Sequence, residues 1–345
     1  MIGLNMGLAW ESANIINSPS EVEGLIGWWD FTDINQLYVD IDSYDNQVSS
    51  NNDKIGRCKN KAWPLITGTN LPNSNIRLGT FARAIGDASR PTYKTGGQNG
   101  YSYALLDNSS NTEGLVTRST STDWGAIASD RLSTSILQNF QLSLFIIGEP
   151  TDDDSDGSDE IVFSYLGYRG RDTSIADEEQ STIFTFQRQD DEDQIAKWVL
   201  QSTGSTSPPV PTNTIDATQP ASHWNSGETT ILNMNTSTAA GGSYIYTNNV
   251  ADTGQTIYWP GSGLAAQEGV ADMDPSGYTS GATGFTTSVG IGGQTTTTGS
   301  LGNSFEGKIY EILIYSGSHL TNFMGESNRA ALNYYFSNKY NITIN

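Results

Sequence analysis

Short stretches of alternating apolar and polar residues recur along most of the chain and predict many short β-strands. Two of them, 140–150 and 305–315, are apolar on both faces, so we expect them in the middle of a sheet, covered on both sides. The expected strands are 23–32, 53–61, 81–83, 91–94, 101–107, 140–150, 161–168, 182–187, 197–201, 229–235, 242–250, 285–294 and 305–315.

The pattern changes near the C-terminus, where apolar residues begin to recur at helical spacing. From Asn322 or Glu326 onward they form one stripe, which predicts an amphipathic helix with Thr321 at its N-cap. The stripe consists of Ala331, Leu332, Tyr335, Phe336 and Tyr340. A single late helix after many strands has to lie on the outside of a β-structure. The pattern therefore predicts an all-β fold with one C-terminal helix.

Adjacent tryptophans mark the first strand, 23–32. Because neighbouring side chains on a strand point to opposite faces, Trp28 and Trp29 should enter different layers. Asp30 follows them directly. It could bind a ligand, but such an acid more often caps the turn after a strand, and we favour that interpretation.

These two ends of the chain resemble the opening strand and the closing strand and helix of laminin-G-like, concanavalin A-like jelly-roll domains. The matching opening residues are Leu25, Trp28, Trp29 and Asp30. The matching closing residues are Phe305, Gly307, Ile309, Glu311, Tyr315, Leu320, Thr321, Arg329, Tyr335, Phe336, Lys339 and Tyr340. Phe336 stands where that family usually has Leu, and Asn249 stands where Gly is usual. The resemblance implies a two-sheet concanavalin A-like jelly-roll sandwich and indicates little about a ligand.

The resemblance and the strand pattern together predict one large domain. It should span residues 23–345 and carry long polar loops at 202–222 and 251–286. Residues 1–22 are short and mildly apolar, and they are either an arm that tethers the protein to a partner or a frayed leader. Their Gly/Leu-rich start resembles that of bacteriophage virion proteins.

The charge and the cysteine content of the chain limit the binding partners and the cellular compartment that we expect for the protein. Acidic residues outnumber basic ones 38 to 17, giving a net charge of −21, and no Lys/Arg cluster suits a phosphate backbone. We therefore expect no nucleic-acid partner. The segment 53–62 nevertheless holds four of the seventeen basic residues. The single cysteine excludes an intrachain disulfide, and we expect neither a secretory signal nor membrane insertion.

Candidate catalytic groups are sparse. The two histidines, His223 and His319, lie in separate loops, and Cys58 between Arg57 and Lys59 has no evident catalytic partner, so we expect it to be packed and inert. Glucanases with a concanavalin A-like fold carry Glu-x-Asp-x-x-Glu on one strand, and the sequence lacks it. Glu311 has no carboxylate two or four residues away. The sequence predicts that the protein is not an enzyme.

One acidic run resembles a calcium loop. Asp152, Asp154 and Asp156 alternate before Gly157, which suits a sharp turn with converging carboxylates. The bidentate Glu of such loops is missing, since Phe163 takes its position, and Glu160 could supply a compensating oxygen. A solvated hairpin tip without metal is the alternative. Calcium is the only cofactor that the sequence suggests.

Aromatic residues in predicted loops suggest a sugar site, because a sugar ring offers apolar C–H faces and hydroxyl rims. The candidates are Trp124, Trp224, Tyr258, Trp259 and Tyr278. The same residues could instead wedge the loops onto the body or face a neighbouring subunit.

Three functions follow as hypotheses. The leading one is a non-catalytic structural protein on a virion surface, a capsid decoration or fibre-type component. It would contact other virion proteins through the N-terminal arm and could form a homo-oligomer. The alternative is a carbohydrate-binding module for a host receptor or algal glycan. A glycoside hydrolase with an atypical site is the third and least favoured.

Overall fold

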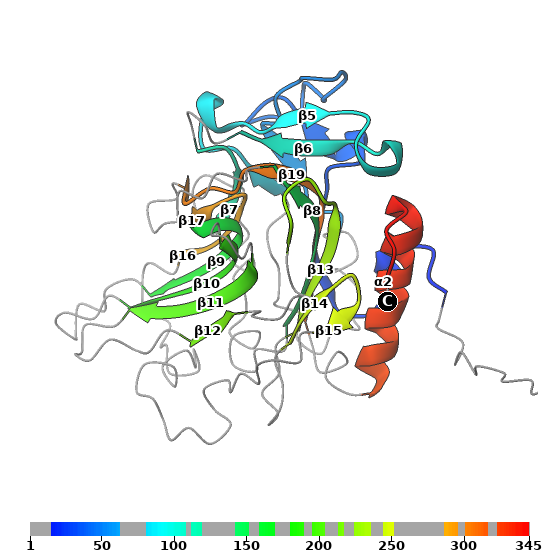
Figure 1. Cartoon of the computed structure of the whole chain (residues 1–345). Coiled ribbons are helices and arrows are strands. Elements are labelled where there is room, and N and C mark those ends of the chain that lie inside the picture. The colour runs from blue at the N-terminus through cyan, green and yellow to red at the C-terminus, as the bar shows by residue number, and fades with distance from the viewer. Residues whose placement is uncertain are drawn as a thin grey trace, which may run out of the picture.

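The computed structural model describes most of the predicted sandwich. It covers residues 15–62, 81–107, 112–118, 142–151, 159–169, 180–189, 195–203, 213–216, 224–235, 244–251, 286–295, 301–316 and 323–344 of the 345-residue chain. Within these residues, strands in two large antiparallel sheets and one C-terminal helix form an all-β sandwich (Figure 1). The predicted fold class is confirmed.

Sheet A carries the two strands that are apolar on both faces. Its order is β15-β14-β13-β8-β19-β6-β5, with β1 paired to β19 beside this path. Its strands are β1 (Leu25–Asp30), β5 (Thr92–Lys94), β6 (Tyr103–Leu106), β8 (Leu142–Pro150), β13 (Thr230–Asn235), β14 (Tyr244–Thr247), β15 (Val250–Ala251) and β19 (Gly307–Ser316). The central positions of β8 and β19 agree with their sequence pattern.

Sheet B lies across the core from sheet A and has the order β12-β11-β10-β9-β16-β7-β4-β3-β2. Its strands are β2 (Leu37–Tyr38), β3 (Arg57–Lys59), β4 (Phe81–Arg83), β7 (Leu115–Arg118), β9 (Asp159–Arg169), β10 (Gln180–Gln189), β11 (Ile195–Thr203), β12 (Asn213–Asp216) and β16 (Thr286–Ile291). A small pair, β17 (Gln294–Thr295) and β18 (Leu301–Gly302), lies next to it in sequence. Short 3-10 turns occupy Pro19–Glu21, Ile34–Gln36, Asp87–Ser89 and Gln98–Gly100.

The main core lies between the two sheets. Trp29, Ile312 and Ile314 from sheet A pack in one buried cluster with residues of sheet B such as Cys58 and Phe163. Gly292 marks a tight place at its edge: its φ is +78°, and a Cβ there would come within 1.9 Å of Leu106 Cδ2. Only glycine fits such a position without displacing its neighbours.

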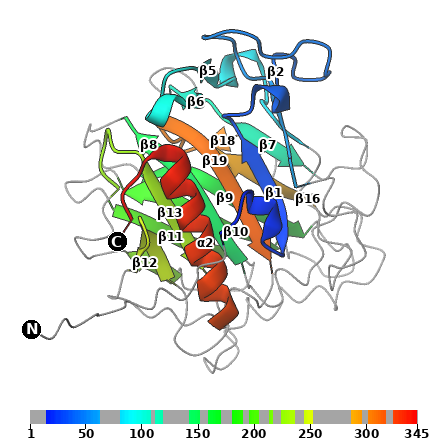
Figure 2. The ribbon, with the colours of Figure 1, turned by 90° about the vertical axis from the view of Figure 1, so that its right-hand side faces the viewer.

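The helix α2 (Phe323–Tyr340) covers the outer face of sheet A, where it crosses β13, β8 and β19 (Figure 2). Leu332, Phe336 and Tyr340 are fully buried against Trp28 and Leu313 in a second apolar cluster. The predicted stripe and the opposite faces of Trp28 and Trp29 are thereby confirmed, since Trp28 packs under the helix and Trp29 enters the main core. No helix among the described residues is both long and apolar enough to cross a membrane.

The C-terminal end of α2 is held by a loop from sheet A. Gln98 Nε2 donates to the Tyr340 carbonyl at 2.9 Å, and Asn99 Nδ2 donates to the Lys339 carbonyl at 2.8 Å. The last carbonyls of a helix have no partner within the helix, so these amides satisfy two of them. Nearer its start, Arg329 donates to Asn249 Oδ1 and stacks 3.9 Å from the ring centroid of Tyr246.

Residues 15–22 lie on the same outer face and belong to the body of the protein. Val22 is buried in the cluster beneath α2, Ile16 packs against that cluster, and Tyr315 donates its hydroxyl to the Pro19 carbonyl at 3.0 Å. The predicted arm of residues 1–22 therefore contacts the body through Ile16, Pro19 and Val22, while Ile15 is 76% exposed and the first fourteen positions lie outside the described residues.

The predicted strands recur within a few residues, whereas the observed strands β7 and β12, and the two-residue strands β2 and β18, were not predicted. Strand β12 falls inside 202–222, which the Ser/Thr/Pro content had predicted to be a loop, because pairing with β11 supplies the order that its own sequence lacks. The β14–β15 turn places Asn248 and Asn249 at φ values of +48° and +71°. Asparagine tolerates this region well, which explains how it replaces the usual Gly.

Candidate functional site

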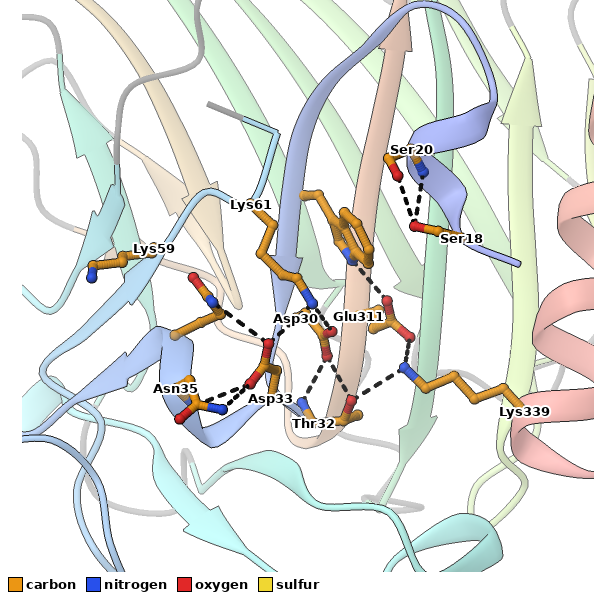
Figure 3. Close-up of polar contacts among 12 residues, drawn as sticks. Ser18, Ser20, Asp30, Thr32, Asp33, Asn35, Lys59, Lys61, Glu311 and Lys339 are labelled. Atoms are coloured by element: carbon orange, nitrogen blue, oxygen red, sulfur yellow. Dashed lines mark hydrogen bonds and ion pairs between the residues drawn. The ribbon is translucent and has the colours of Figure 1, made fainter. Parts of the chain in front are cut away.

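Two carboxylates that are far apart in sequence meet on the outer face of sheet A. Asp30 on β1 is paired in register with Glu311 on β19, so their side chains leave the sheet on the same face. They are 2% and 0% exposed, beneath the C-terminal part of α2. Figure 3 shows them with the lysines that approach from either side. We call Asp30, Lys61, Glu311 and Lys339 the buried charge network.

Glu311 is surrounded by hydrogen-bond donors. Its Oε1 accepts from Lys339 Nζ at 2.7 Å and from the Tyr340 hydroxyl at 2.5 Å, both on α2. Its Oε2 accepts from the indole N–H of Trp28 at 2.8 Å. The carboxylate therefore fastens the helix to β1 and β19 at one point.

Asp30 is equally occupied. Its Oδ1 accepts from the backbone N–H and the hydroxyl of Thr32 at 3.0 and 2.6 Å, which caps the turn after β1 as the sequence indicated. Its Oδ2 accepts from Lys61 Nζ at 2.9 Å. Lys61 also reaches Asp33 at 3.1 Å, and its ammonium lies 4.3 Å from the Trp28 ring centroid.

Burial and charge act in opposite directions on these groups. Burial raises the pKa of Glu311, and the charge of Asp30 raises it further, while Lys339 and its hydrogen bond pull it down. Burial alone would lower the pKa of Lys339, but the charges of Glu311 and Asp30 outweigh it and raise that pKa. The pKa of Lys61 is raised in the same way by Asp30 and Asp33 against the effect of burial. Each ammonium is thus held in its charged form by a carboxylate.

The network is arranged to hold elements together. All four carboxylate oxygens accept hydrogen bonds from protein donors, and neither acid has appreciable exposed surface. A general acid or base has to reach a substrate proton directly or through one water. The arrangement offers no such access, so its evident action is to connect α2, β1 and β19.

Of the four predicted calcium ligands, the structure describes Glu160 alone, so the calcium site stays a prediction. Asp152, Asp154 and Asp156 lie outside the described residues. Glu160 is 5% exposed, pairs with Arg188 at 3.1 Å and accepts the Glu306 backbone N–H at 2.9 Å. Its carboxylate is thus engaged within the protein as a core ion pair. Among the described residues, no three or more His, Cys, Asp or Glu side chains gather to hold a metal ion.

The structure describes one of the predicted sugar platforms, Trp224, and contradicts that role for it. Trp224 is 0% exposed and stacks on Phe305 with ring centroids 5.2 Å apart, in the core between the sheets. A buried indole has no face for a sugar ring, so this assignment is corrected: Trp224 precedes β13 as a core residue rather than as a loop platform. Trp124, Tyr258, Trp259 and Tyr278 lie outside the described residues, as do His223 and His319.

The packed, inert role predicted for Cys58 agrees with its position. The side chain is 0% exposed in the main core. Burial raises the pKa of the thiol well above its usual value, and the charge of Asp30 raises it further. A thiol held neutral is a poor nucleophile, because the thiolate is the reactive form.

Comparison with known proteins yields only distant likenesses. No family model matches the chain, and no curated protein matches it. A pentraxin from Limulus polyphemus aligns with 55% of this chain and 69% of its own at 12% identity and a TM-score of 0.29. A Trypanosoma rangeli sialidase covers 94% of this chain at 10% identity and a TM-score of 0.36, although the match spans only 34% of the sialidase. The alginate lyase Aly36B covers 68% of this chain at 10% identity and a TM-score of 0.24. Scores this low carry no functional argument, and the sandwich rests on the strand topology described above.

Proposed function

We propose that this protein is a non-catalytic structural component of a virion surface, a capsid decoration or fibre-type component built on a concanavalin A-like sandwich. The observation that carries the proposal is the saturated state of the buried charge network. Its acids and lysines stabilise the body instead of facing a substrate, as expected for a protein that serves by its shape and its contacts.

The fixed N-terminal segment supports the same proposal. Because residues 15–22 are anchored beside α2, whatever precedes Ile15 starts from a defined point on the outer face of sheet A. We propose that residues 1–14 form the tether to another virion protein. This narrows the contact from the whole of residues 1–22 to the part before the anchor.

Particle assembly tests the tether. Replacing residues 1–14 by a Gly/Ser segment of equal length should leave the melting temperature unchanged and abolish incorporation into particles, measured by mass spectrometry of purified virions. Immunogold labelling of wild-type particles should place the protein on the surface. Absence of the wild-type protein from particles would reject the virion role, and normal incorporation of the replaced variant would reject the tether.

A direct assay tests the non-catalytic part. Incubation with laminarin-like and agar-like polysaccharides should release no reducing ends above background, and Glu311→Gln should not change that result. Turnover by the wild-type protein that is lost in a carboxylate variant of normal fold would overturn the proposal.

One observation favours the alternative of a carbohydrate-binding module. Tyr44, a residue outside the predicted set of sugar platforms, is 42% exposed and is held among cations on the outer face of sheet B. Its surroundings allow a more specific inference.

A further inference from the structure

Cations and aromatic rings alternate on the outer face of sheet B, at its β2–β3–β4 end. Register pairs Tyr38 with Arg57 and Lys59 with Phe81, and these side chains leave the sheet on the face opposite to Cys58. The loop that follows β2 brings Tyr44 over them. We call Tyr38, Tyr44, Arg57, Lys59 and Phe81 the cation–aromatic layer.

The layer holds Tyr44 from several sides. The ring makes edge-to-face contacts with Tyr38 at 4.9 Å and Phe81 at 5.8 Å between centroids. The Arg57 guanidinium lies 4.4 Å from its centroid, and the Lys59 ammonium lies 5.0 Å away. Contacts of this kind fix the orientation of the ring. Tyr44 is nevertheless 42% exposed, so a fixed aromatic surface faces solvent.

Lys59 has unused bonding capacity. Its ammonium donates to the Tyr38 hydroxyl at 2.6 Å, and that is its one hydrogen bond to the described part of the chain. An ammonium has three N–H donors, so two remain for water or a ligand. By contrast, Lys54, Lys61 and Arg83 each lie within 4 Å of a carboxylate.

Arg57 adds a second positive charge without a carboxylate within 4 Å in the described structure. Its Nε and Nη2 both donate to the Ile41 carbonyl, at 3.0 and 2.5 Å. Arg57 is 4% exposed, so it would act on a ligand through its positive charge and not through direct contact. The charge of Arg57 also acts on Asp40, whose pKa it helps to lower, whereas Lys59 has no carboxylate within 4 Å among the described residues. Their combined charge favours an anionic group next to Tyr44.

We infer that the cation–aromatic layer binds a saccharide ring that carries one carboxylate. The ring packs its C–H face against Tyr44, and its carboxylate accepts hydrogen bonds from the free N–H groups of Lys59. The charge of the protein restricts the ligand. Asp42 and Asp45 are exposed on the same loop as Tyr44, and together with the net charge of −21 they oppose a polyanion. A single charged sugar unit suits the site better than nucleic acid.

This inference goes beyond the proposed structural role and does not depend on it. A surface component can bind a sugar acid whether or not it belongs to a particle. Loss of the virion role would leave the cation–aromatic layer and its test unchanged.

Calorimetric titration of the full chain at low ionic strength tests the inference, with glucuronate, glucose and acetate as probes. We expect glucuronate to bind with a dissociation constant on the order of 1 mM, and glucose and acetate to bind at least about tenfold more weakly. Lys59→Gln should remove the preference for glucuronate over glucose. Tyr44→Leu should weaken glucuronate binding by about tenfold, while Tyr44→Phe keeps the ring and should retain binding.

Lys94→Gln is the matched control. Lys94 donates to Asn52 Oδ1 at 2.6 Å, and among the described residues it forms neither an ion pair nor a contact with an aromatic ring. Its loss should leave glucuronate binding unchanged. Equal affinity for glucose and glucuronate, equal affinity for acetate, or no glucuronate binding at about 50 mM would each overturn the inference. An equal loss in Lys94→Gln and Lys59→Gln would do the same, with thermal melting used to confirm that all variants are folded.

Discussion

The buried charge network and the cation–aromatic layer use the same ingredients in opposite ways. In the first, Lys339 and Glu311 are 12% and 0% exposed by side chain, and every carboxylate oxygen accepts a hydrogen bond. In the second, Lys59 retains free donors and Tyr44 is 42% exposed. Both place lysines beside aromatic rings. What differs is whether the protein itself supplies the counter-charge.

A charged group whose hydrogen-bonding positions are all occupied by the protein stabilises the fold, whereas one with free positions can bind a ligand. A buried charge without its partner is costly, so removing one member of a buried pair is expected to destabilise the fold strongly. A cation held only by aromatic rings contributes about 0.5–1 kcal/mol at an exposed site and remains able to bind an anion. The same substitution of charge should therefore have very different effects in the two regions.

Glu311→Gln is expected to cause the largest loss. It leaves the ammonium of Lys339, on α2, without its direct carboxylate partner, and we expect the free energy of unfolding to fall by about 3–5 kcal/mol, measured by urea denaturation. Asp42→Asn is the control, because its ion pair with Arg83 joins an acid that is 81% exposed, and it should change stability by about 1 kcal/mol or less. Similar losses in both variants would contradict the structural role of the buried charge network.

Trp224→Ala measures how much the free energy of unfolding falls when packing alone is lost. Trp224 is fully buried and stacked on Phe305, so its removal should cost about 3–5 kcal/mol. Glucuronate binding per folded molecule should stay unchanged, measured by titration below the melting temperature of the variant. If the variant kept its stability but lost sugar binding, Trp224 would be a platform and its place in the core would be wrong.

Lys339→Met should make stability depend on pH. Burial and Asp30 already raise the pKa of Glu311 above its ordinary value of 4.5, and loss of Lys339 should raise this pKa further. A carboxyl with a raised folded-state pKa contributes stability that is present below its unfolded pKa and is lost as pH rises through the folded pKa. The variant should therefore lose about 2 kcal/mol relative to wild type at pH 8, and less at pH 5.

Urea unfolding of both proteins between pH 5 and 8 checks this. The sign distinguishes Glu311 from Asp33, whose pKa is lowered because the Lys61 and Asn35 hydrogen bonds and the Lys61 charge outweigh its burial. Asp33 loses its contribution only as pH falls below its ordinary value of 3.8. A penalty in Lys339→Met that grew toward pH 5 would contradict the assignment of Glu311.

Lys59→Gln should have the smallest effect on stability. Its ammonium is held by Tyr38 and by ring contacts alone, so we expect a loss of about 1 kcal/mol or less. Differential scanning calorimetry beside Glu311→Gln measures both on one scale. A loss of stability as large as that of Glu311→Gln would mean that the cation–aromatic layer stabilises the fold as the buried charge network does.

Local pattern was sufficient for most of the elements, with β7 and β12 among the exceptions, and insufficient for the sites. The spacing of Leu332, Phe336 and Tyr340 predicted the helix, and the adjacency of Trp28 and Trp29 predicted two layers, because both depend on periodicity along the chain. The turn cap by Asp30 was also predicted, since its partner Thr32 is two residues away.

The sequence alone could not predict which residues meet across paired strands. Glu311 has no carboxylate two or four residues away in the sequence, yet Asp30 lies opposite it in register, because the pairing of β1 with β19 brings them together. Tyr44 and Lys59 meet for the same reason, through the loop after β2. Trp224 does lie in a loop before β13, but its polar sequence neighbours gave no sign that the side chain is buried against Phe305, a partner far away in the sequence.

A double-mutant cycle tests the central claim most directly, that the buried counter-charges within the protein make the buried charge network a structural element, unlike an ion pair at the surface. Urea unfolding of Glu311→Gln, Lys339→Met and the double variant should give a coupling energy of about 2 kcal/mol. The same cycle on Asp42 and Arg83 should give about 0.5 kcal/mol or less. Equal coupling energies, or a larger value for the exposed pair, would contradict the account.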